Sequence, residues 1–161
     1  MDKHTPHIIP RISDNRIQIW NLLHDGEITA LSEGDGETLT MFVSIPYLRR
    51  RLEPLGDSFV LTLSGLTRLE FEDFDGVATP FREEMKDCDI DILLTESESM
   101  PATIEVNAGK LTLEYQSIHF ALDTGRTIEY EEIEKVCDEY WTEWATDAER
   151  RSHSASQDDE R

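Results

Sequence analysis

The feature that most constrains this chain is an alternation of apolar and polar residues with a period of two. It recurs between residues 17 and 122, as at Leu39, Met41 and Val43. Such a period places the apolar side chains on one face of a β-strand and the polar side chains on the other. The pattern is typical of antiparallel sheets with one solvated face, and not of parallel sheets that are buried on both faces.

Turn residues separate the alternating stretches. Asp25-Gly26 lies between residues 17–24 and 27–32, and an Asp-Gly pair in this position predicts a two-residue hairpin loop. Further turns are expected at residues 34–36, Ser64-Gly65, Asp75-Gly76 and residues 107–109. We therefore predict a mainly β fold, an antiparallel meander of about nine short strands. A meander of this length must curl into either a sandwich or a flattened barrel.

Two stretches follow a helical period instead. Near residues 45–53, Ile45, Leu48 and Leu52 recur at spacings of three and four, Ser44 is a suitable N-cap and a proline lies in the first turn. A longer apolar stripe predicts an amphipathic C-terminal helix near residues 129–145 that covers an open end or face of the sheet. Its members are Ile133, Val136, Cys137, Tyr140, Trp141 and Trp144.

The length and composition fit a single folded domain. A chain of 161 residues is the size of one domain, and Leu, Ile, Val and Phe together exceed the fraction that is typical of disordered chains. Both ends of the chain are polar. We expect a flexible N-terminal segment over residues 1–15, a single domain over residues 16–146 and a disordered polar tail over residues 147–161.

The chain is strongly acidic. Its 35 Asp and Glu residues against 15 Lys and Arg residues give a formal net charge of −20 at pH 7. Such a charge repels phosphate backbones and anionic lipid headgroups, so we expect no nucleic-acid partner and no binding to a membrane surface. No apolar run is long enough for a signal peptide or a membrane span, which predicts a cytoplasmic location.

Motifs for catalysis or metal binding are absent from the sequence. It contains no glycine-rich phosphate loop, no G-x-S-x-G elbow and no H-E-x-x-H pattern. Cys88 and Cys137 are widely separated and have no ligands at zinc spacing, so both are expected to be buried thiols. Asp87, Asp89 and Asp91 alternate like the first ligands of a calcium loop, but an isoleucine follows where that loop needs glycine.

The histidines do not indicate a catalytic site either. His24 adjoins the Asp25-Gly26 turn and His119 lies on the polar side of its predicted strand. Either imidazole could act as a base near neutral pH, yet the sequence implies no nucleophile or carboxylate beside it. We therefore predict no catalytic residue, no metal ligand and no cofactor, and we favour a protein that is not an enzyme.

Two features suggest an interaction surface. Residues 49–51 are three consecutive arginines that would fan across the exposed side of the first helix and could bind a carboxylate or phosphate. The second helix combines many acidic residues with aromatic residues at the edge of its apolar stripe, which could anchor a basic partner. The candidate interface residues are Arg49, Arg50, Arg51, Glu131, Asp138, Tyr140 and Trp141.

These observations lead to three hypotheses for function. The first is a non-enzymatic, acidic protein-binding module of the inhibitor, immunity or adaptor type, which docks a basic partner protein. The second is a β-barrel that encloses a small apolar ligand, and the third is a hydrolase with a dispersed site. The sequence leaves the identity of the partner and the oligomeric state open.

Overall fold

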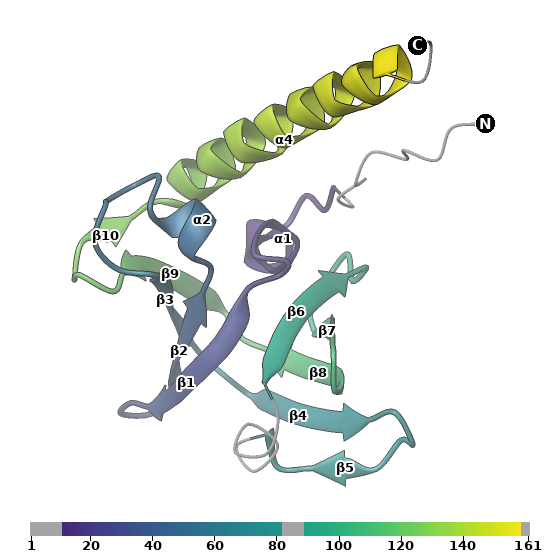
Figure 1. The fold of residues 1–161 in the computed structure, drawn as a ribbon. Helices are drawn as coiled ribbons and strands as arrows, with labels where there is room; N and C mark the ends of the chain where they lie inside the picture. The colour runs from purple at the N-terminus through teal and green to yellow at the C-terminus, as the bar shows by residue number, and fades with distance from the viewer. Residues whose placement is uncertain (1–10, 82–88, 159–161) are drawn as a thin grey trace.

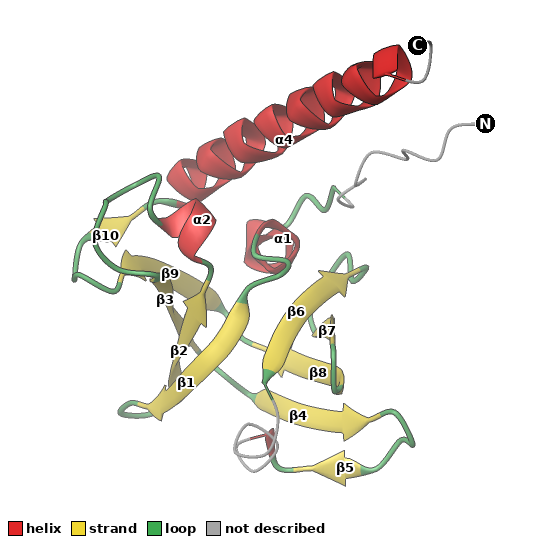
Figure 2. Cartoon of the chain, in the orientation of Figure 1, coloured by secondary structure: helices red, strands yellow, loops and turns green. Residues whose placement is uncertain are grey.

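A single sheet of antiparallel strands is the main feature of the computed structural model, which describes residues 11–81 and 89–158, with side chains as far as Ser152. Figure 2 shows the strands gathered below the helices. In chain order the strands are β1 (Glu27–Glu33), β2 (Thr38–Ser44), β3 (Ser58–Ser64), β4 (Arg68–Asp73), β5 (Ala78–Thr79), β6 (Ile90–Thr95), β7 (Ala102–Val106), β8 (Gly109–Glu114), β9 (Ser117–Leu122) and β10 (Thr127–Ile128). The predicted mainly β, antiparallel fold is confirmed, with ten strands in place of about nine.

The strands arise from the two-residue period that the sequence shows. In β2 the side chains of Leu39, Met41 and Val43 are fully buried, whereas the intervening Thr40 and Phe42 are half-buried. Met41 lies opposite the equally buried Leu61 of β3. One face of the sheet therefore supplies the core and the other faces solvent, as the alternation predicts.

The sheet curls so that its two halves enclose one core. Its strand order is β10-β9-β3-β2-β1-β6-β7-β8-β4-β5, and the halves meet where β1 and β6 pair over only two positions. Irregular pairing within β1 and within β6 adds local twist near this junction. The chain crosses between the halves after β3 and again after β8, where the Gln116 N–H donates to the Ser64 carbonyl at 2.9 Å. Buried residues of both halves form one continuous cluster.

A helix, α1 (Asn15–Leu22), replaces the strand predicted over residues 17–24. All residues from Ile17 to Leu22 are buried, because the helix lies between the two halves of the sheet and the C-terminal helix (Figure 1). Asp14 caps its N-terminus by accepting a hydrogen bond from the Arg16 N–H at 3.0 Å. The Asp25-Gly26 turn consequently joins a helix to β1, and the hairpin predicted there is wrong.

Buried amides tie α1 to the sheet. The Asn21 side chain donates to the Thr95 carbonyl at 3.1 Å and accepts from the Thr95 N–H at 2.9 Å. Gln18 accepts from Asn21 at 3.2 Å and from the Ile12 N–H at 3.1 Å. The described part of the segment that was expected to be flexible is therefore attached to α1.

Helices α2 and α4 lie where the sequence predicts helices, with different limits. The first, α2 (Pro46–Arg49), is shorter than the predicted 45–53, and its N-cap is Ile45 because Ser44 still belongs to β2. The second, α4, runs over Tyr130–Asp158, so it continues through most of the predicted disordered tail. Figure 1 shows α4 crossing the end of the sheet and then extending away from it.

A test of the strand packing is the substitution Gly109→Ala at the start of β8. Gly109 has a φ of +150° and faces Asp73 of β4, and a Cβ atom there would lie 2.1 Å from the Glu72 carbonyl oxygen. We expect Gly109→Ala to lower the free energy of unfolding by about 2 kcal/mol or more, measured by urea denaturation. The control Gly34→Ala, whose Cβ would meet only Thr38 at ordinary contact distance, should leave stability nearly unchanged. Equal effects of the two substitutions would contradict this packing.

Candidate functional site

Helix α4 carries most of the candidate interface residues, and its burial changes along its length. Tyr130, Ile133 and Cys137 pack against the core, and Tyr140 and Trp141 are half-buried. From Thr142 to Ser152 every residue is exposed except the half-buried Ala148. The helix therefore has an inner part that anchors it and an outer part that presents side chains to solvent.

Two contacts fix the inner part of α4 on α1. The Cys137 thiol donates to the Leu22 carbonyl at 3.3 Å, and the Trp141 ring stacks on His24 with 4.9 Å between ring centroids. His24 is itself buried and its Nδ1 lies 2.7 Å from the Asn21 carbonyl oxygen. His24 thus helps to hold α4 in place, which sequence reasoning did not foresee.

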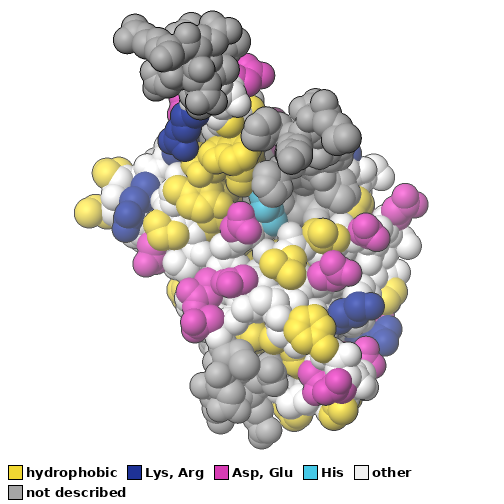
Figure 3. All heavy atoms as spheres, turned by 45° about the vertical axis from the view of Figure 1, so that its right-hand side comes forward, with side chains coloured by type: hydrophobic (Ala, Val, Ile, Leu, Met, Phe, Trp, Pro, Cys, Tyr) yellow, Lys and Arg dark blue, Asp and Glu magenta, His cyan; other side chains and the backbone are white. Residues whose placement is uncertain are grey.

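Four aromatic side chains form a connected group along α2 and α4, the aromatic row. Tyr47 of α2 lies 4.5 Å from Tyr140, Tyr140 lies 5.0 Å from Trp141, and Trp141 lies 5.8 Å from Trp144, measured between ring centroids. Both ends of the row are exposed, Tyr47 at 36% and Trp144 at 45%, whereas Tyr140 and Trp141 between them are half-buried. Figure 3 shows hydrophobic side chains gathered below the projecting end of the helix, with charged side chains at their border.

Arg51 joins the residues that follow α2 to the outer part of α4. Its guanidinium binds both carboxylate oxygens of Glu143, one through Nη1 at 3.1 Å and the other through Nη2, and lies 5.4 Å from the centre of the Tyr140 ring. The hydrogen bonds from Arg51 hold the pKa of Glu143 below its ordinary value. Two candidates from separate sequence regions, Arg51 and Tyr140, thus meet in one place.

Arg49 does not belong to this surface. Its side chain has no exposed area, because the helical turn points it inward, and it pairs with Asp123 at 2.6 Å. Its guanidinium also donates to the carbonyl oxygens of Ser58, Glu53 and Leu55. The expectation that all three arginines fan across an exposed face is correct for Arg50 and Arg51 and wrong for Arg49.

The environment of Asp123 shows that the Arg49 pair is structural. Burial alone would raise the pKa of Asp123, but hydrogen bonds from the backbone N–H groups of Asp57 and Ser58 and from Arg49 hold it below its ordinary value. The carboxylate joins the loop after β9 to the start of β3 and, through Arg49, to α2. Arg49 therefore stabilises the end of the sheet on which α2 rests.

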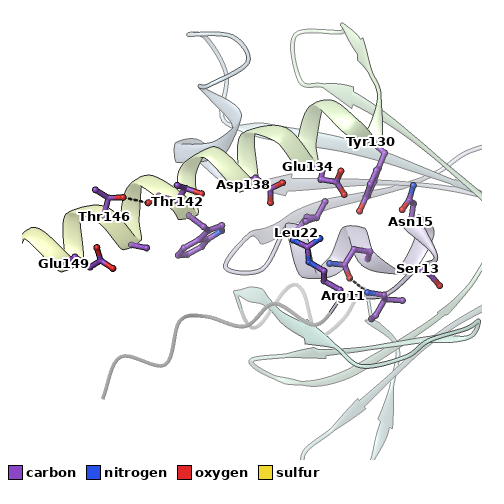
Figure 4. Close-up of a pocket in the computed structure, with 14 residues that line it drawn as sticks. Arg11, Ser13, Asn15, Leu22, Tyr130, Glu134, Asp138, Thr142, Thr146 and Glu149 are labelled. Carbon is purple, nitrogen blue, oxygen red and sulfur yellow. Dashed lines mark hydrogen bonds between the residues drawn. The ribbon is translucent and has the colours of Figure 1, made fainter. Parts of the chain in front are cut away.

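A groove of about 740 Å³ lies on the other side of α4, between this helix, α1 and the residues that precede α1. Figure 4 shows Tyr130, Glu134 and Asp138 along α4, with Arg11 and Ser13 on the opposite wall. The candidates Asp138 and Trp141 line this α1–α4 groove, whereas Glu131 is exposed in the first turn of α4 and does not. The sequence prediction missed the groove because it assigned residues 11–15 to a flexible segment, although Asp14 is a recognisable N-cap.

The described His, Cys, Asp and Glu side chains do not gather into a metal centre. Within residues 11–81 and 89–152, no three His, Cys, Asp or Glu side chains come together in a way that could hold a metal ion. Of the residues considered for calcium and for thiol chemistry, Asp87 and Cys88 lie outside the described residues. His119 is exposed on β9, as its place in the predicted strand implies.

Comparisons with known proteins do not indicate a function. Models of protein families, curated proteins and solved structures all give no match to this chain. None of the helices in the described part of the chain is both long and apolar enough to cross a membrane. Function must therefore be inferred from the geometry and chemistry of the surface itself.

The role of Arg49 can be tested with a matched pair of substitutions. Arg49→Met removes the cationic partner of Asp123, which keeps its two backbone donors, and removes one hydrogen bond from each of three carbonyl oxygens. We expect a loss of about 3–5 kcal/mol in the free energy of unfolding, measured by urea denaturation. Arg50→Met, which changes an exposed side chain one residue along, should have little effect. A loss of the same size in both variants would refute a structural role for Arg49.

The reactivity of Cys137 tests whether a nucleophile is present on α4. Burial, followed by the nearby charges of Asp138 and Glu134, raises the pKa of the Cys137 thiol to about 12. A thiol with that pKa is almost entirely protonated at neutral pH and reacts slowly. In a Cys88→Ser variant we expect a disulfide reagent such as Ellman's to label Cys137 only after unfolding in guanidinium. Rapid labelling of the folded variant would show that the thiol is accessible and activated.

Proposed function

We propose that this protein is a non-enzymatic, acidic protein-binding module of the inhibitor, immunity or adaptor type, and that α4 is its docking element. The observation that carries the proposal is the exposure of α4 from Thr142 to Ser152, in a helix whose inner turns are firmly packed. Helices in water are stabilised mainly by an apolar face that packs against something. A projecting helix with a 45% exposed tryptophan gains such packing when a partner binds.

The charge of the chain supports a basic partner. A net charge of −20 creates a field that attracts cationic proteins and increases their association rate at low ionic strength. The aromatic row provides a short-range anchor within this field, since Tyr and Trp contribute most to binding energy at protein interfaces. The Arg51–Glu143 pair holds part of the row in position before a partner arrives.

The second hypothesis, a β-barrel that encloses a small apolar ligand, has less support, because the core of the sheet is closely packed. Met41, Leu61 and Ile104, which come from both halves, have no accessible surface. Side chains without accessible surface cannot line a cavity that holds even one water molecule. A ligand cavity would have to be formed by other residues, and the α1–α4 groove lies outside the sheet, on its helical cover.

The hydrolase hypothesis receives less support from the pKa values of the buried groups. Burial raises the pKa of Tyr47, Tyr115 and Cys137, which makes these groups weaker nucleophiles and bases at neutral pH. Tyr115 already has a structural part, because it accepts a hydrogen bond from the Trp20 indole at 2.9 Å and donates to the Arg16 carbonyl.

The docking role of α4 can be tested by quantitative affinity capture. Immobilised protein is expected to retain one or more basic proteins from a cell lysate at low salt and to release them at high salt. Trp144→Ala should abolish this capture, because it removes the most exposed ring of the aromatic row. Phe74→Ala is the matched control, since Phe74 is 79% exposed at the β4–β5 hairpin, at the far end of the molecule from α4 (Figure 1).

The comparison between the variants decides the outcome. Capture that is lost with Trp144→Ala and kept with Phe74→Ala supports docking through α4. The proposal is overturned if the wild-type protein captures no salt-sensitive protein, or if both variants capture the same proteins as the wild type does.

A further inference from the structure

We propose that the α1–α4 groove binds a basic, extended segment of the partner protein that carries both cationic and apolar side chains. This inference rests on the proposed function and adds the chemistry of the partner. It starts from the charges on the groove walls, where Glu134, Asp138 and Glu149 of α4 face Arg11, the single cation among the described residues that line the groove. The three carboxylates are exposed, so they are accessible to an incoming cation.

Acidic and apolar side chains share one face of α4, with an apolar pair between the acidic residues. Asp138, Trp141, Ala145 and Glu149 are separated by three or four residues, so their side chains lie above one another along the groove. Leu22 of α1 contributes further apolar surface. A polyamine or a metal ion would satisfy the carboxylates but would leave this apolar surface uncovered.

A buried hydroxyl supplies the second, independent observation. Tyr130 lies at the inner end of the groove and is only 8% exposed, and Figure 4 shows its side chain directed into the space between α4 and Asn15. Its hydroxyl oxygen is buried, and no hydrogen bond of standard geometry satisfies it within the described part of the chain, although the Glu134 carboxylate lies beside it. Burial, the Glu134 charge and the contact with the Glu134 carboxylate raise the pKa of Tyr130, so the hydroxyl stays protonated and can donate to an acceptor.

A polypeptide segment can complement the carboxylates, the apolar surface and the Tyr130 hydroxyl at the same time. Its lysine or arginine side chains can pair with the α4 carboxylates, its apolar side chains can cover Trp141 and Ala145, and a main-chain carbonyl can accept from Tyr130. From Glu134 to Glu149 the helix rises by about 22 Å at 1.5 Å per residue. An extended segment of roughly seven residues spans this distance at about 3.3 Å per residue.

A synthetic peptide tests this assignment directly. The probe is a fluorescein-labelled, capped peptide of roughly seven residues in which lysines and leucines both occur at every second position, so that one face of the extended chain carries both types, and its length is set by the groove. Its affinity for the full chain is measured by fluorescence anisotropy at low salt. We expect Glu134→Gln combined with Asp138→Asn to weaken binding about tenfold or more. Tyr130→Phe should weaken it by a smaller factor, about threefold to tenfold, because one hydrogen bond is lost and the ring is kept.

A second double variant removes the same charge elsewhere. Glu72→Gln combined with Asp75→Asn neutralises two exposed carboxylates on β4 and the β4–β5 turn. It should leave the affinity within about twofold, because interactions between exposed charges are largely screened beyond a Debye length. Circular dichroism of each variant confirms that the fold is retained, so that a loss of binding reports on the groove.

Each remaining outcome counts against the assignment. Equal losses in the two double variants would show that the net charge alone attracts the peptide, and spermine binding as tightly as the peptide would show that a polyamine is sufficient. If Glu134→Gln with Asp138→Asn leaves peptide binding intact while capture still depends on Trp144, the groove assignment is wrong and the proposed function stands. If the wild-type chain binds neither the peptide nor any salt-sensitive protein, both fail.

Discussion

A ten-stranded sheet with one apolar face has to remove that face from water, and this one does so by curling its two halves around a common core. Each fully buried Leu or Ile contributes about 1.5–3 kcal/mol relative to its exposed state. Exposed ion pairs such as Arg68–Glu70 contribute far less because water and salt screen them. The core therefore determines where the helices have to lie, and the charged surface follows from it.

The junction between the two halves explains the position of α1. Because β1 and β6 pair at only two positions, the sheet diverges beyond them and leaves the core open at that end. Helix α1 fills this opening, and its residues from Ile17 to Leu22 are buried against the sheet and α4. Its two buried amide side chains are tolerated because Asn21 and Gln18 make hydrogen bonds to Thr95 and Ile12. The inner turns of α4 then cover α1, whereas most residues of the outer turns, from Thr142 to Ser152, are exposed.

The strands could be predicted from the sequence and the packing of α1 could not. Leu39, Met41 and Val43 show the period of a strand with one wet face, and β2 forms there. In α1 the polar residues Gln18 and Asn21 are buried, so the contrast that separates an amphipathic helix from an alternating strand is lost. Arg49 is a similar case, since a buried arginine with a carboxylate partner 74 residues away leaves no trace in the local sequence. The burial of the α1 amides and of Arg49 depends on partners that are distant in the sequence, and the local pattern of residues does not show those partners.

The candidate surface shows the same division. The acidic and aromatic composition of α4 is visible in the sequence, but the helix places Tyr140 beside Arg51 and places Asp138 and Trp141 in a groove. Charge alone would attract many cationic molecules with little discrimination, because long-range fields carry sign and not shape. Apolar area and a directed donor such as the Tyr130 hydroxyl reject ligands that cannot cover or accept from them, since an unmatched buried polar group costs free energy. On the proposed function, the net charge determines the association rate of a partner, and the shape of the groove determines which partner binds stably.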